Sequence, residues 1–398
     1  MSFLSVKKFN FKKTARDVAV ILLSASVIGA LCGVIGAFFV RSIEFVTELR
    51  AENSWIICLL PLGGLATVGL YKLAKTEGIG TVSVIESARG KGSTPIILFP
   101  VIFISTVITH LFGGSAGKEG AALQIGSAVS EAVSKVTRAD ADKRSIYAVC
   151  GMAALFSAAF GTPFGAWVFA LEVVCIKSII ISAAVPALIS SVIANLVSIS
   201  FGATPEKFEV GAIPEFGLAV SAKTLLISAV VALGALIFCY LLHGGEKLFK
   251  KVLKNPFVRI FVGGVILIIL TLIFGTDYNG GGFGVIERIF EEGVVKPEAF
   301  LLKIIFTVIT VSMGFRGGEI VPSLFIGSTL GATLSPLLGL STEFGAAIGM
   351  TAFFSGVTNC PLAIAVISIE LFGFEGFIFF AAASFVARLV SWKKYLYN

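Results

Sequence analysis

Charged side chains are scarce in this sequence of 398 residues. Asp, Glu, Lys and Arg make up 14% of it, against about 25% in an average soluble domain, and the mean hydropathy is +0.97. This composition excludes a soluble enzyme, a disordered chain and a nucleic-acid-binding protein. The net charge of +7, from 31 basic and 24 acidic residues, instead fits a membrane protein whose Lys and Arg gather in cytoplasmic loops.

Histidine is scarcer still, and cysteine occurs in no metal-binding pattern. The two histidines, His110 and His243, belong to no HExxH motif or other ligand cluster. The six cysteines form no CxxC pair and lie within apolar stretches, where a thiol acts as a small packing residue. With no nucleophile elbow or nucleotide loop either, we expect no metal, no other cofactor and no enzymatic activity.

Long apolar runs dominate what is present. A helix needs about 20 mostly apolar residues to span a bilayer, and several runs carry no charge at all. They predict an all-α integral membrane protein with roughly ten spans or more, some of them short or broken by Gly and Pro. The uncharged runs are Val18–Val40, Gly92–Gly117, Ser145–Leu171, Ser178–Pro205, Ile260–Thr276, Ile320–Thr342 and Phe344–Ile369.

Basic residues mark both ends of the chain. The positive-inside rule places such ends in the cytoplasm, so we expect a cytoplasmic basic N-terminus over residues 1–17 and a cytoplasmic C-terminus. Residues 18–398 are expected to form a single transmembrane domain in the lipid bilayer, without a soluble regulatory domain. The basic residues are Lys7, Lys8, Lys12, Lys13 and Arg16 at one end and Arg388, Lys393 and Lys394 at the other.

The sequence contains an internal repeat. Residues 106–109 (Thr-Val-Ile-Thr) recur at 307–310, an offset of 201, and further matches follow in the same order along the chain. We therefore predict two repeats, about 18–205 and 218–398, with a substrate site between them where broken helices point their N-termini at an anion. The further matches are Gly113 with Gly314, Gly117 with Gly318, 125–127 with 326–328, Pro163 with Pro361 and Glu172 with Glu370.

Two glycine-rich breaks precede apolar helical runs at matched positions, and each carries a lone acid. Glu119 follows Lys118 in the first break, and Glu319 lies in the second. Isolated acids at membrane depth are functional by default, and the helix start attracts anions. The alternatives are an ordinary capping glutamate at Glu119 and a salt bridge from Glu319 to Arg316. A third break, 78–81, precedes a helix expected near Val82, although a simple helix-start turn would also explain it.

Taken together, several segments resemble the CLC family of chloride channels and proton-coupled anion transporters. The likeness extends from about residue 20 to the end of the chain. In that family each subunit is an inverted repeat with many tilted and broken helices and its own pore, and two subunits form a homodimer. The segments are Gly117–Gly120, Leu123–Gly126, Gly161–Gly165, Phe169–Glu172, Asn279–Gly284, Gly318–Pro322 and Tyr395–Tyr397.

Departures from the family pattern indicate which clade the chain resembles. Ile79 stands where the chloride-binding turn G-S-G-I-P has its Ser, and Glu319 gives the second turn an acid. Ala121 replaces the Pro that usually ends the gating segment, and Val173 stands where chloride/proton exchangers carry their inner proton-transfer glutamate. The lost Ser and the inserted acid resemble the fluoride/proton antiporter clade.

The resemblance implies proton-coupled fluoride export from a bacterial cell, across the inner membrane. A chloride/proton antiporter or a passive chloride channel on the same fold is the alternative. The implied roles are a proton gate at Glu119, a second proton-transferring acid at Glu319, a central anion site at Tyr397, Ile320, Val321, Ile79 and Gly80, and an outer anion site at Lys118, Gly120 and Ala121.

Overall fold

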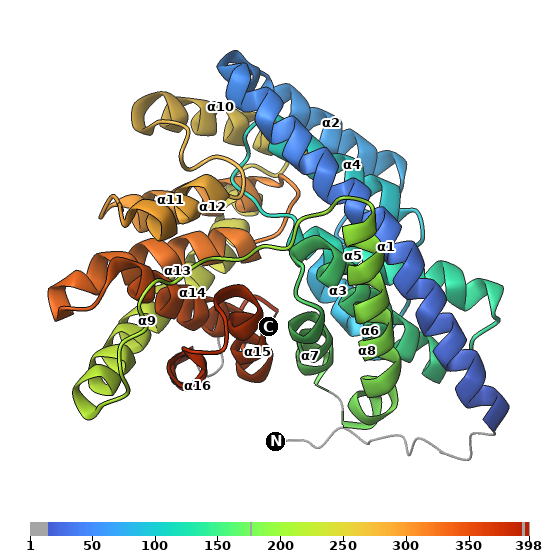
Figure 1. The fold of residues 1–398 in the computed structure, drawn as a ribbon. Helices are drawn as coiled ribbons and strands as arrows, with labels where there is room; N and C mark the ends of the chain where they lie inside the picture. The colour runs from blue at the N-terminus through green and yellow to red at the C-terminus, as the bar shows by residue number, and fades with distance from the viewer. Residues whose placement is uncertain (1–14, 176, 392–394, 398) are drawn as a thin grey trace.

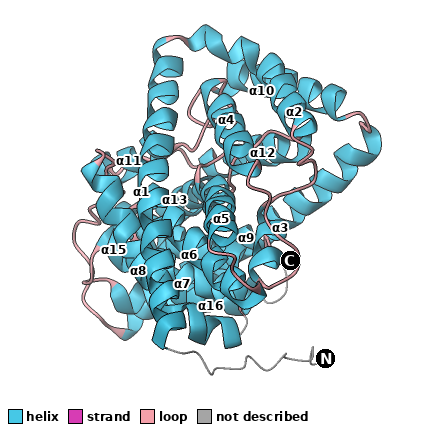
Figure 2. Ribbon diagram, turned by 90° about the vertical axis from the view of Figure 1, so that its right-hand side faces the viewer, coloured by secondary structure: helices cyan, strands magenta, loops and turns pink. Residues whose placement is uncertain are grey.

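The fold was analysed in a computed structural model that describes residues 15–175, 177–391 and 395–397, except for the side chains of 177–180. The predicted basic N-terminus falls mostly outside these residues, as do Lys393 and Lys394. Within the described ranges the chain forms sixteen α-helices, two short 3-10 helices and no strand (Figure 2). This confirms the all-α fold class.

Eight α-helices precede residue 201 and eight follow residue 217. The first eight are α1 (Ala15–Glu52), α2 (Leu60–Leu73), α3 (Thr81–Ala88), α4 (Leu98–Leu111), α5 (Glu119–Val136), α6 (Ala141–Phe160), α7 (Pro163–Val174) and α8 (Lys177–Ser200), with η1 (Ser54–Leu59) before α2. The second eight are α9 (Leu218–Val252), α10 (Pro256–Phe274), α11 (Phe283–Glu292), α12 (Ala299–Met313), α13 (Ile320–Leu334), α14 (Thr342–Thr358), α15 (Pro361–Phe372) and α16 (Phe377–Ser391), with η2 (Pro336–Leu338) after α13.

The second set of helices repeats the packing of the first. Helix α5 packs on α6 as α13 packs on α14, α1 packs on α6 and α8 as α9 packs on α14 and α16, and α3 packs on α5 as α11 packs on α13. The repeat in the sequence is therefore a repeat of helix order and helix contacts. The limits of the two repeats at about 18–205 and 218–398 stay a prediction.

Several uncharged runs are divided where the sequence suggested continuous spans. The run 145–171 is split because Gly161 closes α6 in the left-handed region (φ 75°) and Pro163 starts α7. Its counterpart 344–369 is split in the same way at Asn359 (φ 63°) and Pro361. Proline suits the first turn of a helix, because its missing N–H would have no partner there. Among the described residues six helices are long and apolar enough to span a membrane, and five shorter apolar helices accompany them.

Helices α5 and α13 lie in the middle of the molecule in the view of Figure 2. In the segment Ile320–Leu338, which contains α13, 78% of the most apolar 18-residue stretch is buried. The corresponding share in α10 is only 28%. Outward-facing side chains on α10 include Leu272 and Ile273, which are 77% and 65% exposed. A surface of this kind is covered by lipid in a membrane protein, so α10 faces the bilayer while α5 and α13 face other helices.

Helices α7 and α15 cap each other's N-termini. The Glu172 carboxylate accepts hydrogen bonds from the backbone N–H groups of Leu362 (3.3 Å) and Ala363 (2.8 Å). Glu370 accepts in turn from those of Phe164 (3.0 Å) and Gly165 (2.6 Å). The repeat-matched pair from the sequence thus forms two equivalent contacts, which join the two sets of helices.

The cysteines and His110 pack largely as expected. Cys32, Cys150, Cys239 and Cys360 are buried, but Cys58 and Cys175 are exposed. The prediction that all six cysteines pack in the interior therefore fails for Cys58 and Cys175, which lie at helix ends. His110 is buried, and its Nδ1 lies 2.9 Å from the Thr106 carbonyl oxygen.

Candidate functional site

The two glycine-rich breaks meet at the centre of the fold. The N–H of Gly117 donates to the carbonyl of Gly318, and the N–H of Gly318 donates to the carbonyl of Gly117, each with an N···O distance of 2.6 Å. These two residues were matched by the repeat in the sequence. The turns before α5 and α13 therefore form one antiparallel junction, and both helices begin beside it.

Glycine is required at this junction because the two backbones touch. A Cβ on Gly318 would lie 2.4 Å from the Gly120 nitrogen, and one on Gly317 would lie 2.4 Å from the Ala116 Cβ. Neither separation is possible without movement of the backbone. The glycines that suggested a break in the sequence thus allow the two turns to cross in van der Waals contact.

Side chains of α12 and the loop before α11 hold the first turn. Thr310 Oγ1 accepts the Ser115 N–H at 3.0 Å, and the Ser115 and Thr307 hydroxyls lie 3.0 Å apart. The Gly280 N–H donates to the Gly114 carbonyl at 3.1 Å. Both threonines come from the repeated Thr-Val-Ile-Thr segment, so one use of that motif is to anchor the opposite half's turn.

Three helix N-termini lie around this junction and its neighbouring cavity. Helix α5 begins at Glu119, and α13 begins at Ile320 after Glu319 as N-cap. Helix α3 begins at Thr81 after Gly80, one residue before the expected start. The first N–H groups of a helix have no partner within it, so each terminus presents donors and a positive dipole end to an anion.

Glu119 is completely buried at the start of α5. Among the described residues neither carboxylate oxygen has a partner at hydrogen-bond geometry, and Oε2 lies 2.7 Å from where a Cβ on Gly117 would stand. An ordinary capping glutamate would accept a well-formed backbone hydrogen bond, so this geometry favours a role other than capping. A buried acid without a partner is a costly arrangement that needs another explanation.

Glu319 lies against the start of the other central helix. Its Oε2 is 3.7 Å from the position of a Cβ on Gly120, which places this acid beside the N-terminus of α5. The alternative of a salt bridge from Glu319 to Arg316 is wrong. Within the part of the chain that the structure describes, Glu319 takes part in none of the ion pairs, and the Arg316 guanidinium lies 4.0 Å from the centre of the Tyr71 ring. The Arg316 guanidinium makes a cation–π contact with the face of the Tyr71 ring.

Two cavities with no lining residue in common adjoin the junction, since Gly317 lines one and Gly117 lines the other. The first, which we call the tyrosine vestibule, has a volume of about 630 Å³ and is lined by Ile79, Gly80, Glu319 and Tyr397 among others. The second, which we call the lysine vestibule, has a volume of about 510 Å³ and is lined by Lys118, Gly117 and Val321 among others. Glu119, Gly120, Ala121 and Ile320 line neither cavity and are fully buried. Glu119 therefore belongs to the barrier between the two vestibules.

Tyr397 reaches the centre although it is almost the last residue. The Leu396 N–H donates to the Val357 carbonyl at 2.8 Å, which fixes the end of the chain on α14. Tyr397 is 6% exposed, and its hydroxyl has no hydrogen-bond partner among the described residues. Because Tyr397 lines the tyrosine vestibule, its hydroxyl is an available donor for a bound anion.

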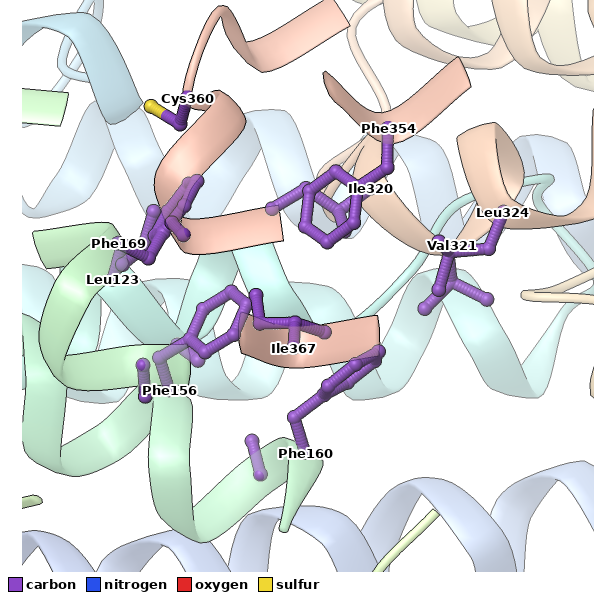
Figure 3. Close-up of a cluster of buried hydrophobic side chains, with 14 of the residues drawn as sticks. Leu123, Phe156, Phe160, Phe169, Ile320, Val321, Leu324, Phe354, Cys360 and Ile367 are labelled. Atoms are coloured by element: carbon purple, nitrogen blue, oxygen red, sulfur yellow. The ribbon is translucent and has the colours of Figure 1, made fainter. Parts of the chain in front are cut away.

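A cluster of phenylalanines lies beside the start of α13. The Phe156 ring lies 5.6 Å from that of Phe160 and 5.1 Å from that of Phe169, and Phe169 lies 6.1 Å from Phe354. Figure 3 shows these rings together with Ile320. Since Phe156 comes from α6 and Phe354 from α14, the cluster joins both halves behind the junction.

Two cations beside the lysine vestibule, one buried and one half-buried, were missed in the sequence. Lys303 is 0% exposed, and its Nζ donates to the carbonyls of Tyr278 (3.1 Å) and Gly280 (2.8 Å). Arg50 donates to the His110 carbonyl. Lys303 is the lone charge of α12 and could have been found by the argument applied to Glu119. Arg50 gave no comparable signal, because several charges surround it in α1.

The lysine vestibule also contains a surface ion-pair cluster. Asp277, in the loop before α11, lies 2.8 Å from Arg288 and 3.0 Å from Lys296. Partial burial acts to raise the pKa of the Asp277 carboxyl, but hydrogen bonds from Lys296 and Arg288 outweigh it and leave that pKa below its usual range. The carboxylate therefore stays ionised and fastens this loop.

At Val173, where chloride/proton exchangers are expected to carry an acid, the backbone of this chain binds an arginine. Val173 and Val174 end α7, and their carbonyls accept hydrogen bonds from Arg89 at 3.0 Å each. Arg89 also pairs with Glu86 at 2.7 Å. A cation at a helix C-terminus is a stabilising cap, so in this chain the end of α7 holds an Arg contact where exchangers of the resembled family have an acid.

Comparison with known proteins identifies the family. The sequence model of the voltage gated chloride channel family matches residues 63–392. The chain belongs to this family, the CLC family. Its relatives include a chloride/fluoride channel protein from Pseudomonas syringae pv. tomato, 32% identical over 95% of this chain and 85% of the relative. An H(+)/Cl(-) exchange transporter of Vibrio campbellii is 27% identical over 88% of this chain and 81% of the relative.

Solved CLC structures share the fold. A CLC-type fluoride/proton antiporter superposes with a TM-score of 0.93 at 30% identity, covering 97% of this chain and 99% of that one. A slow cyanobacterial Cl-/H+ antiporter superposes with a TM-score of 0.83 at 18% identity, covering 95% of this chain and 96% of that one, and this second likeness concerns the fold alone. The chain is thus a CLC-family membrane anion transporter with the inverted-repeat fold that the sequence motifs predicted.

Proposed function

We propose that the chain is a proton-coupled fluoride exporter, a fluoride/proton antiporter that protects a bacterial cell from fluoride. The observation that carries this proposal is Glu119, which is fully buried beside the junction and has no hydrogen-bond partner in the described part of the chain. In this position the carboxylate blocks the path when charged and carries a proton when neutral. A passive pore needs no such group, so we favour coupled exchange over a channel.

Glu319 supplies the second proton step in this proposal. It lines the tyrosine vestibule and lies beside the start of α5, so a proton leaving Glu119 has an acceptor on that side. Val173 cannot act as an acceptor because it has no titratable group. The inner acid of this chain therefore lies on the α13 turn, opposite the place used by chloride/proton exchangers.

The anion site is proposed to consist mainly of backbone donors. Fluoride is small and strongly hydrated, so a site must replace its water with close, strong donors. The helix starts offer N–H groups near Gly80, Ile320 and Val321, and Tyr397 adds a hydroxyl. The hydrogen edges of the nearby phenylalanine rings carry positive charge, which an anion tolerates in an apolar interior. Ile79, Gly80 and Tyr397 line the tyrosine vestibule, whereas Val321 lines the lysine vestibule and Ile320 lines neither. The proposed outer site takes the N–H groups of Gly120 and Ala121 and the positive charge of Lys118.

The proposed assembly is a homodimer with one pore per subunit. We place it in the bacterial inner membrane with both termini in the cytoplasm, because the basic ends of the sequence favour that side. On this arrangement the tyrosine vestibule faces the cytoplasm and the lysine vestibule faces outward. Helix α1 connects the two sides, since its basic N-terminal end and Arg50 near its other end lie 35 residues apart along one helix.

Ion fluxes from liposomes test the function. Purified protein is reconstituted in liposomes loaded with fluoride or with chloride, and anion efflux and external pH are recorded together. Faster fluoride than chloride efflux, accompanied by proton uptake, is expected. Equal efflux of the two anions contradicts fluoride selectivity and favours the chloride/proton antiporter. Anion flux without proton movement contradicts antiport and favours a channel.

A further inference from the structure

The connection between the two sets of helices is fastened beside the lysine vestibule. Figure 1 shows this segment, residues 201–217, crossing the molecule between α8 and α9. The Phe208 N–H donates to the Leu371 carbonyl at 2.9 Å, and the Phe208 ring stacks on Phe290 at 4.9 Å. Pro205 lies so close to Gly161 that a Cβ there would be 2.5 Å from the proline Cα. These contacts on both sides fix the position of Glu206.

Glu206 meets the lysine that precedes the buried gate. Its Oε1 lies 3.2 Å from the Lys118 Nζ, and the two side chains are only 21% and 8% exposed. The same ammonium lies 5.5 Å from the centre of the Phe283 ring. Lys118 is thus held from two directions, by an acid of the connecting segment and by the first residue of α11, and both partners line the lysine vestibule.

An ammonium without a partner at this place would act strongly on any nearby anion. Charges in a half-buried site interact several times more strongly than in bulk water. A freed Lys118 would attract either the transported anion in the lysine vestibule or the carboxylate of the adjoining Glu119. Either contact would retain negative charge where an exporter must release it, because tight binding at an exit slows dissociation.

We propose that Glu206 is a positioning residue that pairs with Lys118 of the outer site, offsets its positive charge and so keeps anion binding in the lysine vestibule weak. The connecting segment then has a function beyond joining the two repeats, since it delivers the acid that neutralises this cation. The inference rests on the proposed function in one respect only: the lysine vestibule is taken as the mouth by which the anion leaves.

Inhibition of efflux by anion added on the far side of the membrane measures this binding. The full chain is reconstituted as wild type, Glu206→Gln, Lys118→Gln, the double variant and Glu209→Gln. Initial fluoride efflux is recorded against rising external fluoride. We expect Glu206→Gln to lower the inhibition constant about three- to tenfold, the size of one partly buried charge contact. The double variant should lose the increased inhibition and match Lys118→Gln, because it has no freed lysine.

Glu209→Gln is the matched control, since Glu209 is an exposed acid of the same segment and should leave the constant unchanged. An unchanged constant in Glu206→Gln overturns the proposal, and so does a double variant that is inhibited as strongly as Glu206→Gln. If Glu206→Gln does not fold, Glu206→Asp keeps the charge but shortens the reach. An inhibition constant below wild type supports the proposal there, and a wild-type constant overturns it.

The two proposals fail separately. Wild-type efflux is measured first, and absence of fluoride efflux alongside chloride efflux would contradict fluoride export. Chloride then replaces fluoride as the probe in the same series of variants. The inhibition constants of the variants, measured with the anion that the wild type transports, then decide the role of Glu206.

Discussion

Gly117 and Gly318 exchange two backbone hydrogen bonds of 2.6 Å each, one in either direction. They are separated by 201 residues and precede α5 and α13, two largely buried helices. Because the pairing uses backbone groups alone, it fixes the starts of α5 and α13 relative to each other without any side chain in the way. The carboxylates of Glu119 and Glu319 follow directly, so their separation is set by this junction.

Gly318→Ala is expected to disrupt the junction. The added methyl group would meet the Gly120 nitrogen at 2.4 Å, and overpacking of this kind costs about 1–3 kcal/mol. We expect a lower thermal unfolding midpoint in detergent and loss of transport. Gly244→Ala is the control, because a Cβ there has no atom within 4 Å. Equal behaviour of the two variants would contradict the close approach of the backbones.

Glu119→Gln is expected to abolish coupled transport. The amide fills the same space but cannot ionise or carry a proton, so proton uptake accompanying anion efflux should fall to the background of empty liposomes. The measurement is the pH-electrode trace during fluoride efflux. Glu375→Gln, on an exposed loop, should behave as wild type. Proton pumping retained in Glu119→Gln would refute the gating role.

Tyr397→Phe is expected to weaken anion binding from the tyrosine vestibule. It removes one hydroxyl donor, and a hydrogen bond to a charged group contributes about 1.5–3 kcal/mol. The concentration of fluoride giving half-maximal efflux should therefore rise at least about tenfold, with little change in the unfolding midpoint. Tyr395→Phe serves as the control, since Tyr395 does not line that vestibule. A wild-type concentration dependence in Tyr397→Phe would exclude the hydroxyl from the site.

Asp277→Asn is expected to destabilise the protein in a pH-dependent way. The folded pKa of Asp277 is depressed, because Lys296 and Arg288 outweigh its partial burial. The contribution of Asp277 to folding stability is therefore fully present above its pKa in the unfolded chain, about 3.9. It is lost as the pH falls through the lower pKa of the folded state.

At pH 7 the free energy of unfolding of the Asp277→Asn variant should be lower than that of the wild type by about 1 kcal/mol, as expected for partly exposed ion pairs. Unfolding midpoints measured between pH 7 and pH 3 should converge at the acidic end. Lys296→Gln removes one of the two pairs and should show a smaller loss. A difference that persists unchanged at the acidic end would mean that the loop is held by something other than this charge.

The sequence by itself determined the membrane class, the repeat, the positions of the helix breaks and the two isolated acids. These features are local: hydropathy, glycine content and a lone charge act on the residues around them, so their pattern is visible along the chain. Lys303 satisfied the same criterion and could have been included. Continuous uncharged runs suggested single spans where the structure has breaks, as at Gly161 and Asn359.

The tertiary structure alone decided the partners. Arg316 stacks on Tyr71 and leaves Glu319 free of it, although Arg316 is only three residues away from that acid. Lys118 pairs with Glu206, 88 residues later. Nothing local selects these contacts, because they depend on which surfaces the packed helices bring together and on which charges the surrounding backbone leaves unsatisfied. Because charged side chains are scarce, the sequence indicates that each isolated one has a function. Only the fold shows which partner each of them has.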